Sequence, residues 1–127
     1  MVGNEAAKEG NSTIMTINER LIEALSMLGI PVTFREFQGD EDRYIVFDYN
    51  TIPIDFADDE PDHEKYLIQV HLFCPLGTNS ISDTRKIKEA LFEAGMTWPE
   101  MTDASDKDSQ HLVFECENAE GIDYGED

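Results

Sequence analysis

The sequence predicts a single α+β domain in which two helices pack with a mostly antiparallel sheet. Two stretches carry apolar residues at three- and four-residue spacing, and each ends at a glycine, Gly29 or Gly95. Runs of β-branched and aromatic residues, typical of strands, lie between and after them. The resulting order is α-β-β-β-α-β-β, which favours the α+β class.

The first helix is predicted to begin at a capping box formed by Thr16 and Glu19, whose side chains can bind free backbone amides. One face of this helix then carries the apolar residues Ile17, Leu21, Ala24, Leu25 and Leu28. Gly29 can adopt the left-handed conformation that closes a helix, and Pro31 prevents the helix from resuming.

Three strands are predicted next, at 32–37 (VTFREF), 43–54 (RYIVFDYNTIPI) and 65–74 (KYLIQVHLFC). Pro53 should mark either the fraying end of the second strand or an edge position. One face of the third strand carries Tyr66, Ile68, Val70 and Leu72, and the other carries the mixed set Leu67, Gln69, His71 and Phe73. This strand is therefore expected to be central, with one half-covered side.

The second helix is predicted to begin near Ser80 or Ser82, because Ser80 and Asp83 have the spacing of a capping box. Its core-facing residues are expected to be Thr84, Ile87, Ala90, Leu91 and Ala94. A short strand at 96–98, broken by Pro99, and a last strand at 111–116 should complete the sheet. The residues expected in the core include Leu25, Val70, Leu91 and Phe114.

The similar segments EALSMLGI (23–30) and EALFEAGM (89–96) have two readings. They are either the remnant of a duplication or the common requirement of two helices that dock on one sheet.

The 127 residues are predicted to divide into a flexible arm (1–13), a single α+β domain (14–117) and an acidic tail (118–127). No apolar run is long enough to cross a membrane, and no signal segment is recognisable at the start. The protein is therefore expected to be soluble and to stay in the cell that makes it. Cys74 and Cys116 match no metal-ligand spacing and are expected to be buried free thiols.

The formal net charge of −19 disfavours binding to nucleic acid or to an anionic membrane. The acids gather in DFADDEPDHE (55–64), read as a solvated loop, and in the tail. The loop lacks the glycine of a helix-loop-helix calcium site, and Phe56 and Ala57 interrupt its spacing. A weak divalent-ion site between subunits remains open, and no cofactor is predicted.

The sequence shows no catalytic, cofactor-binding or metal-binding motif, so the chain is expected not to be an enzyme. Its three histidines are His63, His71 and His111. A nucleophile could be imagined from Cys74 or Ser80 with His71 as base, but no strained nucleophile turn surrounds either residue. His71 is read as a residue of the sheet face.

Two surfaces of opposite charge are candidate interfaces. One face of the second helix that is not its core face carries Arg85, Lys88, Glu89 and Phe92. Arg85, Lys86 and Lys88 are three of only nine basic residues. The alternative is an ordinary solvated helix face. The predicted acidic partner surface is the loop that carries Asp58, Asp59, Glu60 and Asp62.

The order of the segments IPVTFREF, RYIVFDYNTIPIDFADD, HEKYLIQVHLFCPLG and SDTRKIKEALFEAG resembles that of the tail-completion, or tail-terminator, proteins of long-tailed bacteriophages and prophages. The resemblance covers about residues 14–117 and rests on element order and hydrophobic pattern.

The resemblance implies a structural subunit of the virion, assembled in the host cytoplasm. Such subunits form a ring, often a hexamer, that caps the tail tube and meets the head-connector proteins. The alternative is an acidic DNA mimic that inhibits a host nuclease or restriction system. A mimic should space its carboxylates like phosphates, whereas the acids here concentrate in one loop and one tail.

Overall fold

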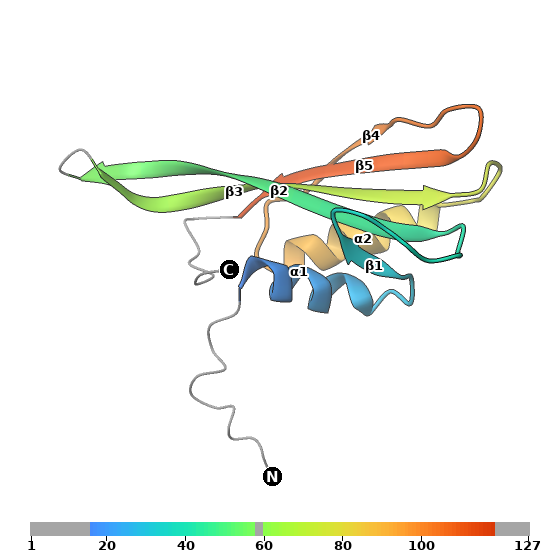
Figure 1. Ribbon diagram of the computed structural model, residues 1–127, viewed down its shortest axis with the longest axis horizontal. Coiled ribbons are helices and arrows are strands. Elements are labelled where there is room, and N and C mark those ends of the chain that lie inside the picture. Colours follow the sequence, from blue (N-terminus) through green and yellow to red (C-terminus); the bar gives the residue numbers. More distant parts are fainter. Residues whose placement is uncertain (1–15, 58–59, 119–127) are drawn as a thin grey trace, which may run out of the picture.

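The computed structural model describes residues 16–57 and 60–118, without the side chains of 54–63. The chain forms two layers, in which both helices lie on the same face of one five-stranded sheet (Figure 1). The elements are α1 (Ile17–Ser26), β1 (Val32–Phe34), β2 (Tyr44–Ala57), β3 (Glu60–Cys74), α2 (Ile81–Glu93), β4 (Glu100–Asp103) and β5 (Gln110–Glu117).

The sheet has the strand order β1-β2-β3-β5-β4. The pair β1–β2 is parallel and the other pairs are antiparallel, so the predicted class and element order are confirmed. Strand β3 is central, as expected: Val70 lies opposite Phe47 of β2 on one side and Phe114 of β5 on the other.

The core lies between the helices and the inner face of the sheet. The predicted core residues Leu25, Val70, Leu91 and Phe114 are all 0% exposed. Cys74 and Cys116 belong to the same core and are free thiols, as the sequence predicted.

The first helix is capped as predicted. The backbone N–H of Glu19 donates to Thr16 Oγ1 at 3.1 Å, and the backbone N–H of Thr16 donates to Glu19 Oε1 at 3.0 Å. After the two helices, Gly29 and Gly95 have φ angles of +78° and +102°. Both glycines therefore adopt the positive φ that closes a helix, as predicted.

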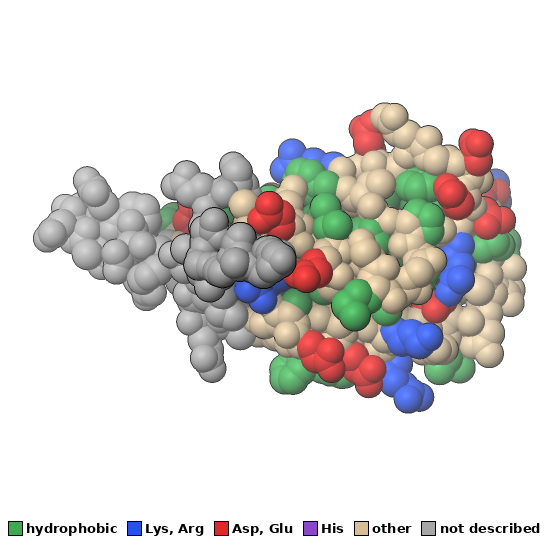
Figure 2. All heavy atoms as spheres, turned by 90° about the horizontal axis from the view of Figure 1, so that it is seen from below, with side chains coloured by type: hydrophobic (Ala, Val, Ile, Leu, Met, Phe, Trp, Pro, Cys, Tyr) green, Lys and Arg blue, Asp and Glu red, His purple; other side chains and the backbone are tan. Residues whose placement is uncertain are grey.

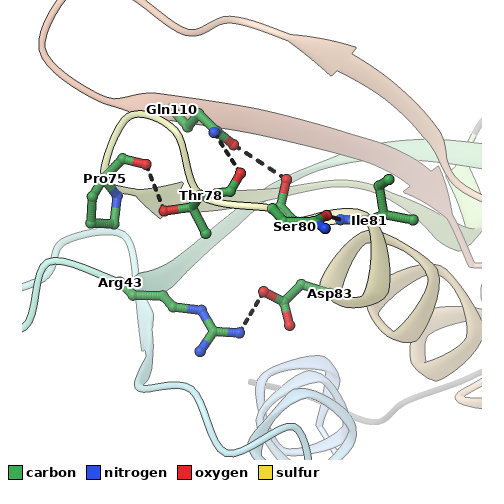
Figure 3. Close-up of polar contacts among 8 residues, drawn as sticks. Arg43, Pro75, Thr78, Ser80, Ile81, Asp83 and Gln110 are labelled. Carbon is green, nitrogen blue, oxygen red and sulfur yellow. Dashed lines mark hydrogen bonds and ion pairs between the residues drawn. The ribbon is translucent and has the colours of Figure 1, made fainter.

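The predicted capping box of the second helix is wrong. The hydroxyl of Ser80 donates to Gln110 Oε1 of β5 at 3.2 Å, and Asp83 forms an ion pair with Arg43 (Figure 3). The first amide of α2, on Ile81, donates to Asn79 Oδ1 at 3.2 Å instead. Contacts with distant strands have replaced the local cap.

Several strand boundaries differ from the sequence prediction. Strand β1 ends at Phe34 because Arg35 has a φ of +74°, outside the extended region. The strand expected at 96–98 is reduced to a bridge between Met96 and Asn118, and β4 begins after Pro99, which has no N–H to donate.

The acidic segment predicted as a loop is mostly strand. Residues 55–57 continue β2 and residues 60–64 begin β3, and the register pairs Ala57 with Glu60. Only Asp58 and Asp59 of this segment lie outside the described residues.

The arm at 1–13 and residues 119–127 lie outside the described residues, and Asn118 is buried, with its Oδ1 accepting from the N–H of Tyr66 at 2.7 Å. Neither described helix has the length and apolar composition needed to cross a membrane.

Truncating Leu91 to alanine should lower the free energy of unfolding by about 2–5 kcal/mol, because it removes a fully buried side chain of α2. Glu89→Ala, on the exposed side of the same helix, should change it by less than about 0.5 kcal/mol. Denaturant unfolding followed by circular dichroism measures both. Equal losses in the two variants would contradict the assigned core face.

Candidate functional site

The β2–β3 hairpin is longer than the sheet to which it belongs. Strand β1 pairs with β2 only at 45–47, and β5 pairs with β3 only at 67–74. Residues 51–57 and 60–65 therefore form a two-stranded ribbon with no third strand among the described residues. This ribbon, called here the hairpin arm, projects past the helices at one end of the molecule (Figure 1).

The hairpin arm carries the predicted acidic surface. Glu60 and Asp62 lie in β3, where the backbone pairs with β2, while Asp58 and Asp59 lie outside the described residues. Glu64, at the base of the arm, is exposed. The structure thus places the described part of the acidic segment on a projecting strand and not on a loop.

The predicted basic surface lies on the outer side of α2. Arg85 is exposed, Lys88 is half-buried, and the Phe92 side chain is 54% exposed. The ion pairs within the described residues use Arg35, Arg43, Lys65 and Lys107. Arg85 and Lys88 therefore have no ion-pair partner in that part of the chain.

Trp98 extends this surface. The sequence analysis predicted that this residue lies in a short strand at 96–98. Its ring lies 5.6 Å from that of Phe92 in an edge-to-face arrangement, and Trp98 is 51% exposed. Pro99 could have indicated the exposure of Trp98. A proline interrupts strand pairing, so the residue before it lies at the end of a strand. Arg85, Lys88, Phe92 and Trp98 are called the α2 patch below.

The hairpin arm and the start of the α2 patch lie at opposite ends of the long axis. Helix α2 begins at the end of the sheet where β3 finishes, and the arm projects from the other end (Figure 1). Seen from the helix side, a group of basic side chains lies over the half of the molecule away from the arm (Figure 2).

The outer face of the sheet is not covered by either helix and carries a row of aromatic rings. Tyr44 stacks on Phe37 at 4.1 Å and on Phe73 at 4.9 Å, and Phe73 stacks on His111 at 4.2 Å. His71 lies beside this row, with its Nδ1 2.8 Å from His111 Nε2. All five rings are half-buried.

The same face is acidic farther along the strands. The lining of a hollow of about 620 Å³ there includes Trp98 and the carboxylates Asp48, Glu100, Glu115 and Glu117, among other polar and apolar residues. Arg35 pairs with Asp48 at 3.0 Å and Lys65 with Glu117 at 3.2 Å, so two of these carboxylates have cationic partners.

The structure does not bring Cys74 or Ser80 together with His71 as a nucleophile and its base. Cys74 faces the core, whereas His71, three residues earlier in the same strand, faces outward. The Ser80 hydroxyl is bound to Gln110 and not to a histidine. Within 16–57 and 60–118, no group of three or more His, Cys, Asp or Glu could hold a metal ion.

Comparisons with known proteins establish the fold alone. No protein-family model and no curated protein matches the chain. Among solved structures of similar fold, one superposes with a TM-score of 0.54 at 13% identity, covering 80% of this chain and 90% of the other. Nearly the whole of that chain therefore shares this architecture.

The two thiols should be unreactive in the folded protein. Burial raises the pKa of Cys116 to about 12, and burial, followed by the nearby Asp83, raises the pKa of Cys74. Both groups therefore stay protonated at pH 8, and only the thiolate is a nucleophile. An aromatic disulfide reagent should label neither thiol at pH 8 without denaturant and both in guanidinium. Rapid labelling of the folded chain would contradict their placement.

Proposed function

We propose that this chain is a structural subunit that assembles head-to-tail into a ring, with the role of a tail-completion protein of a long-tailed phage or prophage. In that role the ring, often a hexamer in the family that the chain resembles, caps the tail tube and meets the head-connector proteins. The protein acts through its surfaces and not through a reaction.

The observation that carries the proposal is the hairpin arm. A two-stranded ribbon alone is only marginally stable in water, because it buries little apolar surface. Here residues 51–57 and 60–65 pair with each other beyond the reach of β1 and β5. An arm of this length is well suited to contact a neighbouring subunit, where a third surface would cover it.

The separation of charge also supports a head-to-tail contact. A heterologous interface joins two different patches of one subunit, and a ring closes when the rotation between copies allows it. The acidic arm is one such patch, and the basic α2 patch, which begins at the other end of the molecule, is the second (Figure 1). The chain therefore offers a complementary pair, with the cations of α2 meeting the acids of the next copy's arm.

The resemblance to tail-completion proteins supplies the biological setting of the proposal. The shared feature is the element order, helix, three strands, helix, two strands, with the acidic connection between the second and third strands. The arm and the patch are the surfaces through which this chain would differ from other subunits of that kind.

Self-association should depend on ionic strength. A charge of −19 per subunit opposes association at low salt, and salt or Mg²⁺ screens this repulsion. Analytical ultracentrifugation across a salt and magnesium series, with and without purified tail tubes, should show a larger closed species at higher ionic strength. A monomer under every one of these conditions would contradict the ring, and inhibition of a nuclease by that monomer would favour the DNA mimic.

Reversing the charge of the α2 patch should prevent assembly without unfolding the monomer. Arg85→Glu with Lys88→Glu places acids against the acidic arm of the next copy, so the two copies should repel each other. The monomer should stay folded, because neither native side chain has an ion pair to lose among the described residues. Adding Glu60→Lys and Asp62→Lys should restore assembly in part. The rescue should fade at high salt, because exposed pairs act more on partner choice than on total affinity.

Arg85→Glu alone should also weaken assembly, and Lys107→Glu is its matched control, because it makes the same change of charge at an exposed position outside both patches. It should leave assembly intact. Normal sedimentation of the double reversal, or equal loss in the control, would show that total charge and not this contact governs association.

A further inference from the structure

His71 and His111 meet across the two neighbouring strands β3 and β5. In the register, His111 lies opposite Phe73 and His71 lies opposite Val113, so the two histidines are diagonal neighbours on one face. Their facing nitrogens, His71 Nδ1 and His111 Nε2, are 2.8 Å apart. This face is the outer one, which neither helix covers.

We propose that His71 and His111 form a two-histidine chelate site for a divalent transition-metal cation, with Cu²⁺ and Ni²⁺ the preferred ions. The site is independent of the ring proposed above, since it lies within one subunit and outside the arm and the α2 patch.

The separation of the two nitrogens favours these ions. Imidazole nitrogens bind such metals at about 2.0–2.1 Å, so two of them lie roughly 2.9 Å apart at a right angle and roughly 3.4 Å apart at a tetrahedral angle. The 2.8 Å separation is close to the first value. Right-angled, tetragonal coordination is typical of Cu²⁺ and Ni²⁺, whereas structural Zn²⁺ is tetrahedral.

The two rings are brought together before a metal arrives, and only their rotation is needed to direct both lone pairs at one ion. The His111 ring stacks on Phe73 at 4.2 Å, and the backbone N–H of His111 donates to Ser105 Oγ at 3.0 Å. Both rings are half-buried, which leaves room for them to turn until their lone pairs meet at one point. A preorganised pair loses little side-chain entropy on binding.

The charges around the pair also suit a cation. The carboxylates that act on the pair are Asp48 and Glu115 for His71, and Asp103 and Asp106 for His111. Their charge attracts a cation.

The hydrogen bond between the rings determines where the protons go when a metal binds. In the neutral pair one facing nitrogen carries the proton and the other accepts it. When a metal binds, the donating ring takes its other tautomer, so both facing nitrogens present lone pairs. At neutral pH no net proton is released, and the remaining coordination positions are taken by water.

Two titrations of the full chain at pH 7 test the site. Imidazole ¹⁵N NMR signals follow the addition of Ni²⁺, Zn²⁺ or Mg²⁺, and electron paramagnetic resonance follows the addition of Cu²⁺. The expected results are a two-nitrogen copper spectrum, selective broadening of His71 and His111 by Ni²⁺, weaker binding of Zn²⁺, and no histidine response to Mg²⁺. Binding should weaken as the pH falls below 6.5, because protons compete for the same nitrogens.

His71→Gln and His111→Gln should each weaken Ni²⁺ binding by about a hundredfold, because each removes the intramolecular second contact of the chelate. His63→Gln, at the only other histidine, is the control and should leave the affinity unchanged. Unchanged affinity in the His71/His111 double variant, a copper spectrum without two nitrogens, or no imidazole response to Ni²⁺ would each overturn the proposal. Amide spectra of each variant check that the fold is retained.

Discussion

The antiparallel pairing of β2 with β3 is the constraint on which the rest of the structure depends. It runs from Tyr44 opposite Phe73 to Ala57 opposite Glu60, and it fixes which side chains of both strands face the helices. Because successive residues of a strand point to opposite faces, a shift of one residue would exchange the core and outer sets. Both helices pack against one face that this pairing creates, and strands β1 and β5 extend the sheet by pairing with the outer edges of β2 and β3.

One strand therefore serves two purposes. Val70 and Leu72 of β3 are fully buried under the helices, while His71 and Phe73, between and beside them, face outward. The inner side stabilises the fold by removing apolar surface from water. The outer side carries rings that are only half-buried, and the register of β3 with β5 places His71 beside His111 among them.

The charge of the chain acts through its distribution and not only through its total. Four of the described cations pair with acids on β2, α2 and β5 and in the loop before β5, whereas Arg85 and Lys88 on α2 have no ion-pair partner in residues 16–57 and 60–118. An acidic arm and an uncompensated basic patch that begins at the other end of the molecule make one copy complementary to the next. The total of −19 then sets the ionic strength at which two copies can meet.

The sequence by itself determined the features that depend on near neighbours. The Thr16 cap, the positive φ of Gly29 and the burial of Leu91 follow from interactions within a few residues or from periodicity, and all were predicted. Tertiary structure decided the rest. Ser80 binds Gln110 and not its own helix. The acids after residue 54 became strand, because backbone pairing across a hairpin can outweigh the low β propensity of aspartate and glutamate. The contact of His71 with His111 depends on the register of strands 40 residues apart in sequence, which no local pattern encodes.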